Sequence, residues 1–171
     1  KTTEKILEDF LTERPITVRC RTHKASLREI VTSLKSQGVT VEQAPYLPYA
    51  LKISDYNHIL TLETFLQGKI LVQDVSSMLV AEAASPKKGD HIIDMCAAPG
   101  GKSIHAADKM GDYGNVDARD VSQYKADLIK ENIHRTGVIN VEARVQDATV
   151  YDPDSEQAAD IVIADVPCSG L

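Results

Sequence analysis

The second half of the chain alternates strand-like apolar runs with helix-like segments, and this alternation constrains the fold more than any other feature. The strand-like runs are residues 91–95, 115–118, 141–145 and 160–164. Helical spacing of apolar residues covers residues 76–85, 100–110 and 122–135. Strands that alternate with helices are joined by right-handed crossovers, which build a parallel sheet covered by helices. The pattern predicts an α/β, doubly wound fold.

Only four such strands fit between residue 74 and the end of the sequence. A nucleotide-binding sheet of this type usually contains five or more strands. We therefore expect residues 74–171 to be the N-terminal part of a Rossmann-like domain, incomplete at its far side. An open sheet edge would promote self-association.

The first half has a different rhythm and predicts a small α+β module over residues 1–73. Helical spacing covers residues 4–13 and ends before Pro15, because a proline disfavours helix in the preceding residue. A strand at residues 17–20 precedes a helix that Ser26 caps and Gly38 ends. Further strands are expected at residues 39–43 and 50–53, whereas the stretch through Gly68 gives no clear pattern.

Charge is distributed unevenly along the chain, whose formal net charge is −6. Residues 1–90 carry 12 Lys and Arg against 11 Asp and Glu, whereas residues 91–171 carry 7 against 14. Within the first half, five cations fall in a stretch without carboxylates: Arg14, Arg19, Arg21, Lys24 and Arg28. This basic stretch is a candidate RNA-binding face, with a solvated face beside a short strand as the alternative.

Composition excludes several other classes of protein. No apolar run reaches the roughly 18 residues that a membrane span needs, and the first residues carry no signal-peptide core, so a cytoplasmic protein without membrane contact is expected. The three cysteines, Cys20, Cys96 and Cys168, form neither an even disulfide set nor a zinc-binding pair. Free thiols and no metal site are expected.

The segment from Asp94 to Lys102 joins the first strand of the parallel sheet to its helix, at the edge where open α/β sheets bind ligands. Its small residues let a ligand approach the backbone. The expected cofactor-binding residues are Cys96, Ala97, Ala98, Pro99, Gly100, Gly101 and Lys102. A phosphate loop is an alternative because Gly101, Lys102 and Ser103 match the end of that motif, but Cys96 stands where its first glycine is required. A structural glycine turn is the other alternative.

Carboxylates follow the next two strands. Asp120 ends the second strand and can accept both hydroxyls of a ribose, although it could instead only cap the following helix. Asp147 follows the third strand, where a short carboxylate can accept an adenine amino group. Both acids are therefore candidate cofactor-binding residues.

An acid and a thiol lie three residues apart after the fourth strand. Asp165 and Cys168 are candidate catalytic residues, because a thiolate is a soft nucleophile and a neighbouring acid can hydrogen-bond a heterocycle under attack. The alternative for a single cysteine is an inert buried thiol. A proline before Cys168 and a glycine two residues after it favour a loop at the ligand edge.

In order along the chain, these motifs resemble the S-adenosylmethionine-dependent RNA cytosine-5 methyltransferases of the Sun/Fmu type, which include the bacterial 16S ribosomal RNA enzyme. The resemblance extends over nearly the whole chain and includes Arg19. Its motifs are residues 72–78, 94–102, 118–120, 146–148 and 165–170.

The resemblance implies that residues 96–102 cradle S-adenosylmethionine, with Asp120 at the ribose, Asp147 at the adenine and Asp165 between the cofactor and the target base. In this family a cysteine adds to position 6 of cytosine, and position 5 then attacks the sulfonium methyl group. Proton removal and elimination release 5-methylcytosine. Asp165 would hydrogen-bond the ring nitrogen that gains electron density. The target would be a single-stranded or extruded cytidine, with ribosomal RNA as the expected partner.

One departure concerns the attacking thiol. The family's nucleophile lies in a later Thr-Cys motif, while the Pro-Cys cysteine, here Cys168, is assigned to product release. No Thr-Cys pair occurs in these 171 residues, so we expect a fragment of a longer enzyme that is inactive by itself. The alternatives are a noncatalytic RNA-binding protein, a nicotinamide-dependent dehydrogenase, which would need the absent G-x-G-x-x-G, and a phosphate-loop enzyme.

Overall fold

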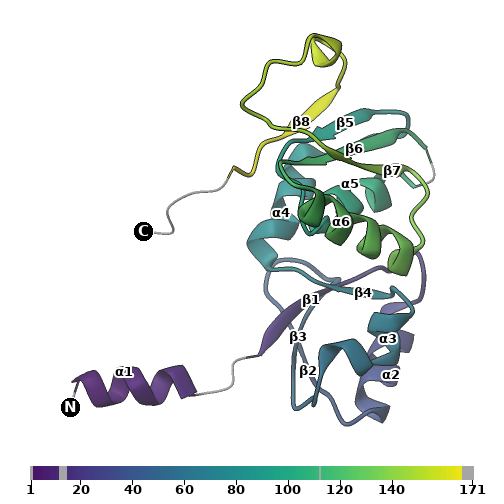
Figure 1. The fold of residues 1–171 in the computed structure, drawn as a ribbon. Helices are drawn as coiled ribbons and strands as arrows, with labels where there is room; N and C mark the ends of the chain where they lie inside the picture. The colour runs from purple at the N-terminus through teal and green to yellow at the C-terminus, as the bar shows by residue number, and fades with distance from the viewer. Residues whose placement is uncertain (1, 12–14, 112, 167–171) are drawn as a thin grey trace.

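The computed structural model describes residues 2–11, 15–111 and 113–166 and contains two separate four-stranded sheets. The first sheet belongs to residues 16–72 and the second to residues 91–163. Figure 1 shows the helices of the second half lying between the two sheets. This helical layer joins the two parts of the molecule.

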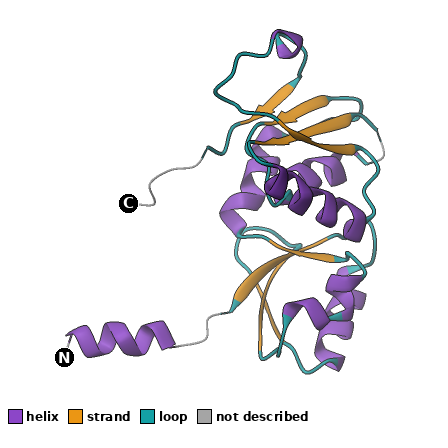
Figure 2. Cartoon of the chain, viewed as in Figure 1, coloured by secondary structure: helices purple, strands orange, loops and turns teal. Residues whose placement is uncertain are grey.

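The N-terminal sheet is antiparallel, with strand order β2-β3-β1-β4. Its strands are β1 (Ile16–Cys20), β2 (Thr40–Gln43), β3 (Ala50–Ser54) and β4 (Ile70–Val72). One face packs against helices α2 (Leu27–Ser36) and α3 (Glu63–Leu66), next to the short 3-10 helix η1 (Ile59–Thr61). Helix α1 (Thr2–Leu11) extends away from this sheet (Figure 2).

The predicted cap of α2 is confirmed. The Ser26 hydroxyl accepts a hydrogen bond from the Glu29 N–H at 3.3 Å, and the Glu29 carboxylate accepts the Ser26 N–H at 2.8 Å. This reciprocal pair satisfies two N–H groups that a helix start leaves without intrahelical partners. The antiparallel sheet and its helices give the N-terminal residues the expected α+β character. The division of the chain between residues 73 and 74 remains a prediction.

The second sheet is parallel throughout, as predicted, with strand order β7-β6-β5-β8. Its strands are β5 (His91–Asp94), β6 (Asn115–Asp120), β7 (Val141–Val145) and β8 (Ile161–Ile163). The helices of this part are α4 (Val75–Ala84), α5 (Gly101–Met110) and α6 (Gln123–Thr136), with a 3-10 turn η2 (Pro153–Ser155) before β8.

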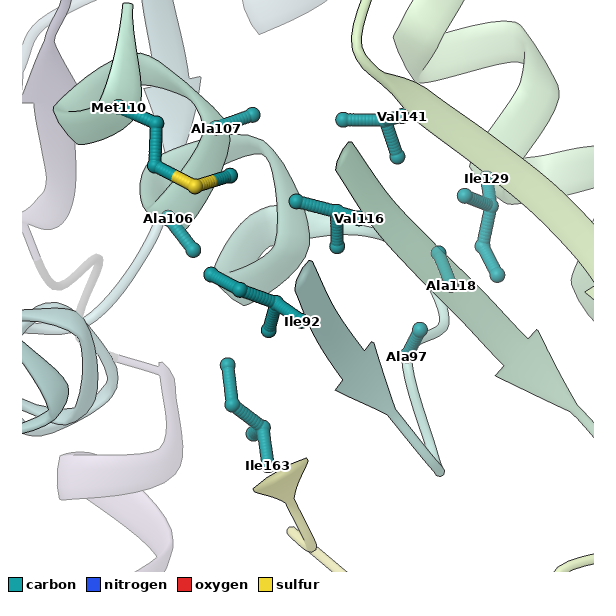
Figure 3. Packing of buried hydrophobic residues seen from close by; sticks show 10 residues of the cluster. All are labelled: Ile92, Ala97, Ala106, Ala107, Met110, Val116, Ala118, Ile129, Val141 and Ile163. Atoms are coloured by element: carbon teal, nitrogen blue, oxygen red, sulfur yellow. The ribbon is translucent and has the colours of Figure 1, made fainter. Parts of the chain in front are cut away.

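The core of the second half lies between the parallel sheet and α5 and α6. Ile92 and Val116 from adjacent strands meet Ala106 and Met110 from α5 and Ile129 from α6, all at most 1% exposed (Figure 3). Because side chains alternate along a strand, Val116 and Ala118 face the helices while Asp117 and Arg119 face the other side. On that other side, Arg119 and Asp117 form an ion pair at 2.6 Å.

The strand order fixes where a ligand can bind. From β5 the chain moves outward through β6 to β7, and it then crosses to the opposite side of β5 to form β8. The connections from β5 and β8 therefore diverge at their carboxyl ends, which creates a crevice at the topological switch point. The segment after β5 opens into this crevice.

Two parts of the first half were not predicted from sequence, namely β4 and the helical turns η1 and α3. The expected end of the first helix, at residues 12 and 13, lies outside the described residues. Within the described part of the chain, no helix is both long and apolar enough to span a bilayer.

Candidate functional site

The loop between β5 and α5 is held from two sides by backbone hydrogen bonds. The Met95 N–H donates to the Ile163 carbonyl of β8 at 2.9 Å, and the Ala97 N–H donates to the Arg119 carbonyl of β6 at 2.9 Å. Gly100 ends the loop with a φ of +100°, a conformation that other residues rarely adopt. A side chain there would also press against Ile129 of α6 at 3.3 Å. These bonds fix the loop at the carboxyl end of β5, between the neighbouring strands β6 and β8.

Asp120 ties the end of β6 to this loop. Its carboxylate accepts the Ala98 N–H at 3.0 Å and the Val121 N–H at 2.8 Å, and it pairs with Lys125 at 3.0 Å. Burial alone would raise the pKa of Asp120, which is 3% exposed, but these bonds outweigh burial and lower the pKa. Asp120 is thus an ionised acceptor next to the loop. The alternative that Asp120 only caps the following helix does not hold, because Ser122, two residues later, is the N-cap of α6.

Asp94, the last residue of β5, lies beneath the loop and is completely buried. One carboxylate oxygen accepts the Ser103 hydroxyl at 2.6 Å, and the other has no hydrogen-bond partner among the described residues. Burial raises the pKa of Asp94 to about 6, against the opposing effects of Ser103 and the nearby Lys102. A buried acceptor without a partner at a ligand edge is the kind of group that a bound donor can satisfy.

Lys102 and Asp165 form an ion pair that joins α5 to the segment after β8. The Lys102 ammonium, in the first turn of α5, lies 2.5 Å from the Asp165 carboxylate, which follows β8. The Asp165 side chain is 58% exposed, whereas that of Lys102 is 20% exposed. The pair brings the predicted catalytic acid to the predicted cofactor loop. Cys168 lies outside the described residues.

Asp147 follows β7 at the carboxyl edge of the parallel sheet, and its carboxylate accepts hydrogen bonds within its own turn. Its carboxylate accepts the Thr149 N–H at 2.9 Å and the Thr149 hydroxyl at 2.7 Å, and both bonds lower its pKa. The preceding residue, Gln146, donates its N–H to the Asp120 carbonyl at 2.9 Å. A cavity of about 280 Å³ beside Asp147 is lined by largely apolar residues that include Met95 and Tyr151. Asp147 therefore borders a hollow beside the loop.

The basic stretch is split by the structure. Arg19 and Arg21 are 2% and 1% exposed and both bind Asp108 of α5, so the expectation that they face RNA is wrong. Their charges are taken up inside the molecule, where a phosphate group cannot reach them. Lys24 and Arg28 are exposed, and the expected RNA-binding residue Arg14 lies outside the described residues.

Two thiols in the described residues are free, as expected. Burial raises the pKa of Cys20 to about 12, against the effect of Arg19. Cys96 is half-buried in the loop, where burial and then the charges of Asp120 and Asp94 raise its pKa. No group of three or more potential metal ligands occurs in the part of the chain that the structure describes.

Sequence reasoning assigned no role to Asp94, Asp108, Gln73 or Lys125. Asp94 was the first residue of the predicted loop segment, and its position at the end of an apolar strand was the available signal. Asp108 had none, because its partner Arg21 is 87 residues away.

Comparison with known proteins decides the family. Residues 81–171 match the family model described as 16S rRNA methyltransferase RsmB/F. The chain belongs to this family. The expected resemblance to the Sun/Fmu-type methyltransferases is confirmed.

Individual relatives support the same assignment. The chain is 36% identical to a probable ribosomal RNA small subunit methyltransferase B of Bacillus subtilis over 98% of its own length and 38% of the relative's. Over 110 residues it is 40% identical to a tRNA (cytosine(72)-C(5))-methyltransferase of Pyrococcus horikoshii, covering 64% of the chain and 28% of that protein. The chain thus spans well under half the length of these relatives.

A solved structure confirms the fold. The crystal structure of PH0851 matches with a TM-score of 0.86 and 33% identity, over 92% of this chain and 36% of that one. The crystal structure of a methyltransferase homologue from Pyrococcus horikoshii matches with a TM-score of 0.69 and 31% identity, over 81% of this chain and 45% of that one. Together with the parallel sheet order, these matches establish the predicted Rossmann-like methyltransferase fold.

Proposed function

We propose that these residues form the cofactor-binding part of an S-adenosylmethionine-dependent RNA cytosine-5 methyltransferase. The observation that carries the proposal is the bond from the Ala98 N–H to Asp120, which joins the loop and a carboxylate at the topological switch point. Family membership and the relatives named for cytosine C5 methylation point to the same reaction.

The residues at this crevice fit such a cofactor. Gly100, with a φ of +100°, shapes the loop close to α6, and the partnerless oxygen of Asp94 offers an acceptor for an ammonium group. Asp120 would hold the ribose hydroxyls, for which Lys125 must yield part of its contact with the carboxylate. Asp147 would hold the adenine amino group. When bound, the cofactor supplies an electrophilic methyl group on a sulfonium centre.

Asp165 would orient the target pyrimidine by a hydrogen bond to its ring nitrogen. Its exposed carboxylate leaves room for a base to approach, and its contact with Lys102 keeps a cation beside it. Cys168 would assist product release, while the attacking thiol would come from a Thr-Cys motif that these residues do not contain. We therefore expect the 171 residues to bind the cofactor without completing turnover.

RNA is the proposed partner, with Lys24 and Arg28 as phosphate contacts on the N-terminal part. The target cytidine has to leave its stack, because an enzyme that acts on a base cannot reach the target atom inside a stacked helix. Self-association is a further proposal, since β8 pairs with β5 on only one side among the described strands. Light scattering would test it, and a monodisperse monomer would refute it.

Calorimetric titration tests the cofactor. We expect heat on addition of S-adenosylmethionine, and none on addition of a nicotinamide dinucleotide or ATP with Mg²⁺. Asp120→Asn should weaken binding, because an amide presents one acceptor where the carboxylate presents two. The matched control is Asp127→Asn, which replaces an exposed acid of α6 and should leave binding unchanged.

The other functions each have a distinct result. Binding of the nicotinamide dinucleotide alone would indicate a dehydrogenase, and binding of ATP alone would indicate a phosphate-loop enzyme. Retention of RNA without any affinity for S-adenosylmethionine would indicate a noncatalytic RNA-binding protein. Robust RNA methylation by this chain alone would refute the proposed need for a further Thr-Cys motif.

A further inference from the structure

A buried polar cluster connects the N-terminal sheet to helix α5, and the proposed mechanism does not use it. The cluster consists of Arg19 within β1, Arg21 directly after β1, Gln73 after β4, and Asp108 in α5. The side chains of Arg19, Arg21 and Asp108 are at most 6% exposed. Charges are seldom buried this deeply unless every partner is fixed in place.

The end of α5 is held by both arginines. Arg21 binds the Asp108 carboxylate through two nitrogens at 2.9 and 2.6 Å, and Arg19 donates to the same carboxylate at 2.7 Å. Burial would raise the pKa of Asp108, but the two arginines outweigh it and lower the pKa. Arg21 also donates to the carbonyls of Gly68 and Thr136, at 2.9 and 2.6 Å, and so links the N-terminal part to the end of α6.

Gln73 lies beside the start of α5, where its buried Nε2 has no hydrogen-bond partner among the described residues. The Arg19 Nε donates to the Gln73 Oε1 at 2.9 Å, and the Gln73 side chain lies 3.8 Å from the position that a Cβ on Gly101 would occupy. Gly101 is the first residue of α5 and follows the loop directly. Arg19 is therefore linked to both ends of a helix about 15 Å long, directly to Asp108 near its end and through Gln73 to its start.

We propose that Arg19 and Gln73 are positioning residues that set the cofactor loop from the N-terminal module. The guanidinium of Arg19 fixes α5 along its axis through Asp108, while the Gln73 amide packs against its first turn. Since the loop ends where α5 begins, a helix free to shift would move Gly100 and Lys102 with it. This inference rests on the proposed function for the identity of the ligand and not for the mechanical link.

Two substitutions of Gln73 separate the link from simple packing. Gln73→Leu keeps the size of the side chain but removes the acceptor for Arg19, whereas Gln73→Glu keeps the size and retains an acceptor for Arg19. Arg19→Gln removes the direct contact with Asp108. Lys35→Gln changes an exposed lysine of α2 in the same module and is the matched control.

The experiment measures hydrogen exchange of the peptide covering residues 95–104 and, separately, the Kd for S-adenosylhomocysteine by calorimetry on the 171-residue chain. We expect Gln73→Leu and Arg19→Gln to speed exchange in this peptide and to weaken binding by about tenfold, as loss of a supporting contact typically does. Gln73→Glu and Lys35→Gln should match the wild type in both measurements.

The results distinguish this inference from the proposed function. Wild-type exchange rates and a Kd within about twofold for Gln73→Leu would overturn the inference, because twofold is under 0.5 kcal/mol at room temperature. If the wild type binds no S-adenosylhomocysteine, the proposed function fails, and hydrogen exchange still decides whether the loop is set by Gln73. If Arg19→Gln does not fold, the two Gln73 variants decide the matter alone.

Discussion

The buried carboxyl of Asp94 provides a quantitative test of the electrostatics beneath the loop. Replacing it by Asn keeps the shape of the side chain and an acceptor for the Ser103 hydroxyl, but removes the ionisable group. Asp94 has a pKa of about 6 in the folded chain against a reference value of 3.8. Since each pKa unit corresponds to about 1.4 kcal/mol, keeping this carboxyl ionised in the fold costs about 3 kcal/mol.

The sign follows from proton binding. Between the two pKa values the folded chain holds a proton that the unfolded chain has released, so this group makes folding less favourable as the pH rises through that interval. About 2 kcal/mol of the effect falls between about pH 4 and pH 8. The free energy of unfolding of Asp94→Asn, minus that of the wild type, should grow by this amount over the same interval. Fixed costs of the substitution cancel in this comparison.

Urea unfolding at a series of pH values, followed by circular dichroism, supplies the measurement. Asp127→Asn, at an exposed position, is the control and should give a difference that stays level. A level difference for Asp94→Asn would mean that Asp94 titrates normally in the fold. That result would refute the assignment of a desolvated carboxyl beneath the loop.

Three further outcomes are expected. Gly68→Ala should lower the free energy of unfolding by more than about 2 kcal/mol, because its φ is +63° and the new Cβ would lie 2.5 Å from the backbone of α6. Gly38 has a φ of +81° but faces open space, so Gly38→Ala should lower the free energy of unfolding by less than half as much in the same urea series. Burial, followed by the charge of a neighbouring arginine, lowers the pKa of His105 to about 3. The unfolded chain therefore binds a proton that the folded chain does not, and the free energy of unfolding should fall as the pH drops from about 6.5 towards 3. His105→Gln should flatten that part of the pH profile, and an unchanged slope would contradict the burial of a neutral imidazole. Mass-spectrometric mapping after brief treatment of the folded chain with a maleimide should find Cys96 modified and Cys20 protected, and equal labelling would contradict the packing of β1.

Local sequence patterns predicted most of the fold because they report short-range physics. The parallel sheet followed from apolar runs that alternate with helical spacing, and the cap at Ser26 followed from a hydroxyl placed before an amphipathic segment. The loop and its acid were predicted for the same reason, since the carboxyl ends of neighbouring parallel strands meet at one edge. Strand β4 was missed because its three residues are too few to show a period.

Long-range pairing could not be predicted from these patterns. Arg19 in β1 and Arg21 just after it alternate with Val18 and Cys20, a pattern that fits either a solvent-facing or a helix-facing side of the strand. The choice depends on Asp108, almost 90 residues later, because only a carboxylate at that place makes burial of two guanidinium groups acceptable. Charge counted along the sequence therefore overestimated the surface available to RNA.

The layer of helices that both sheets share has a practical consequence for dissection of this protein. Met78 of α4 packs with Ala44, Leu47 and Ala50 from the first half, so cutting the chain near residue 73 would bare apolar surface on each product. The same cut would leave an unmatched aspartate on one piece and a pair of unmatched arginines on the other. Attempts to express either half by itself should therefore yield insoluble material, whereas co-expression of the two halves should restore a soluble assembly.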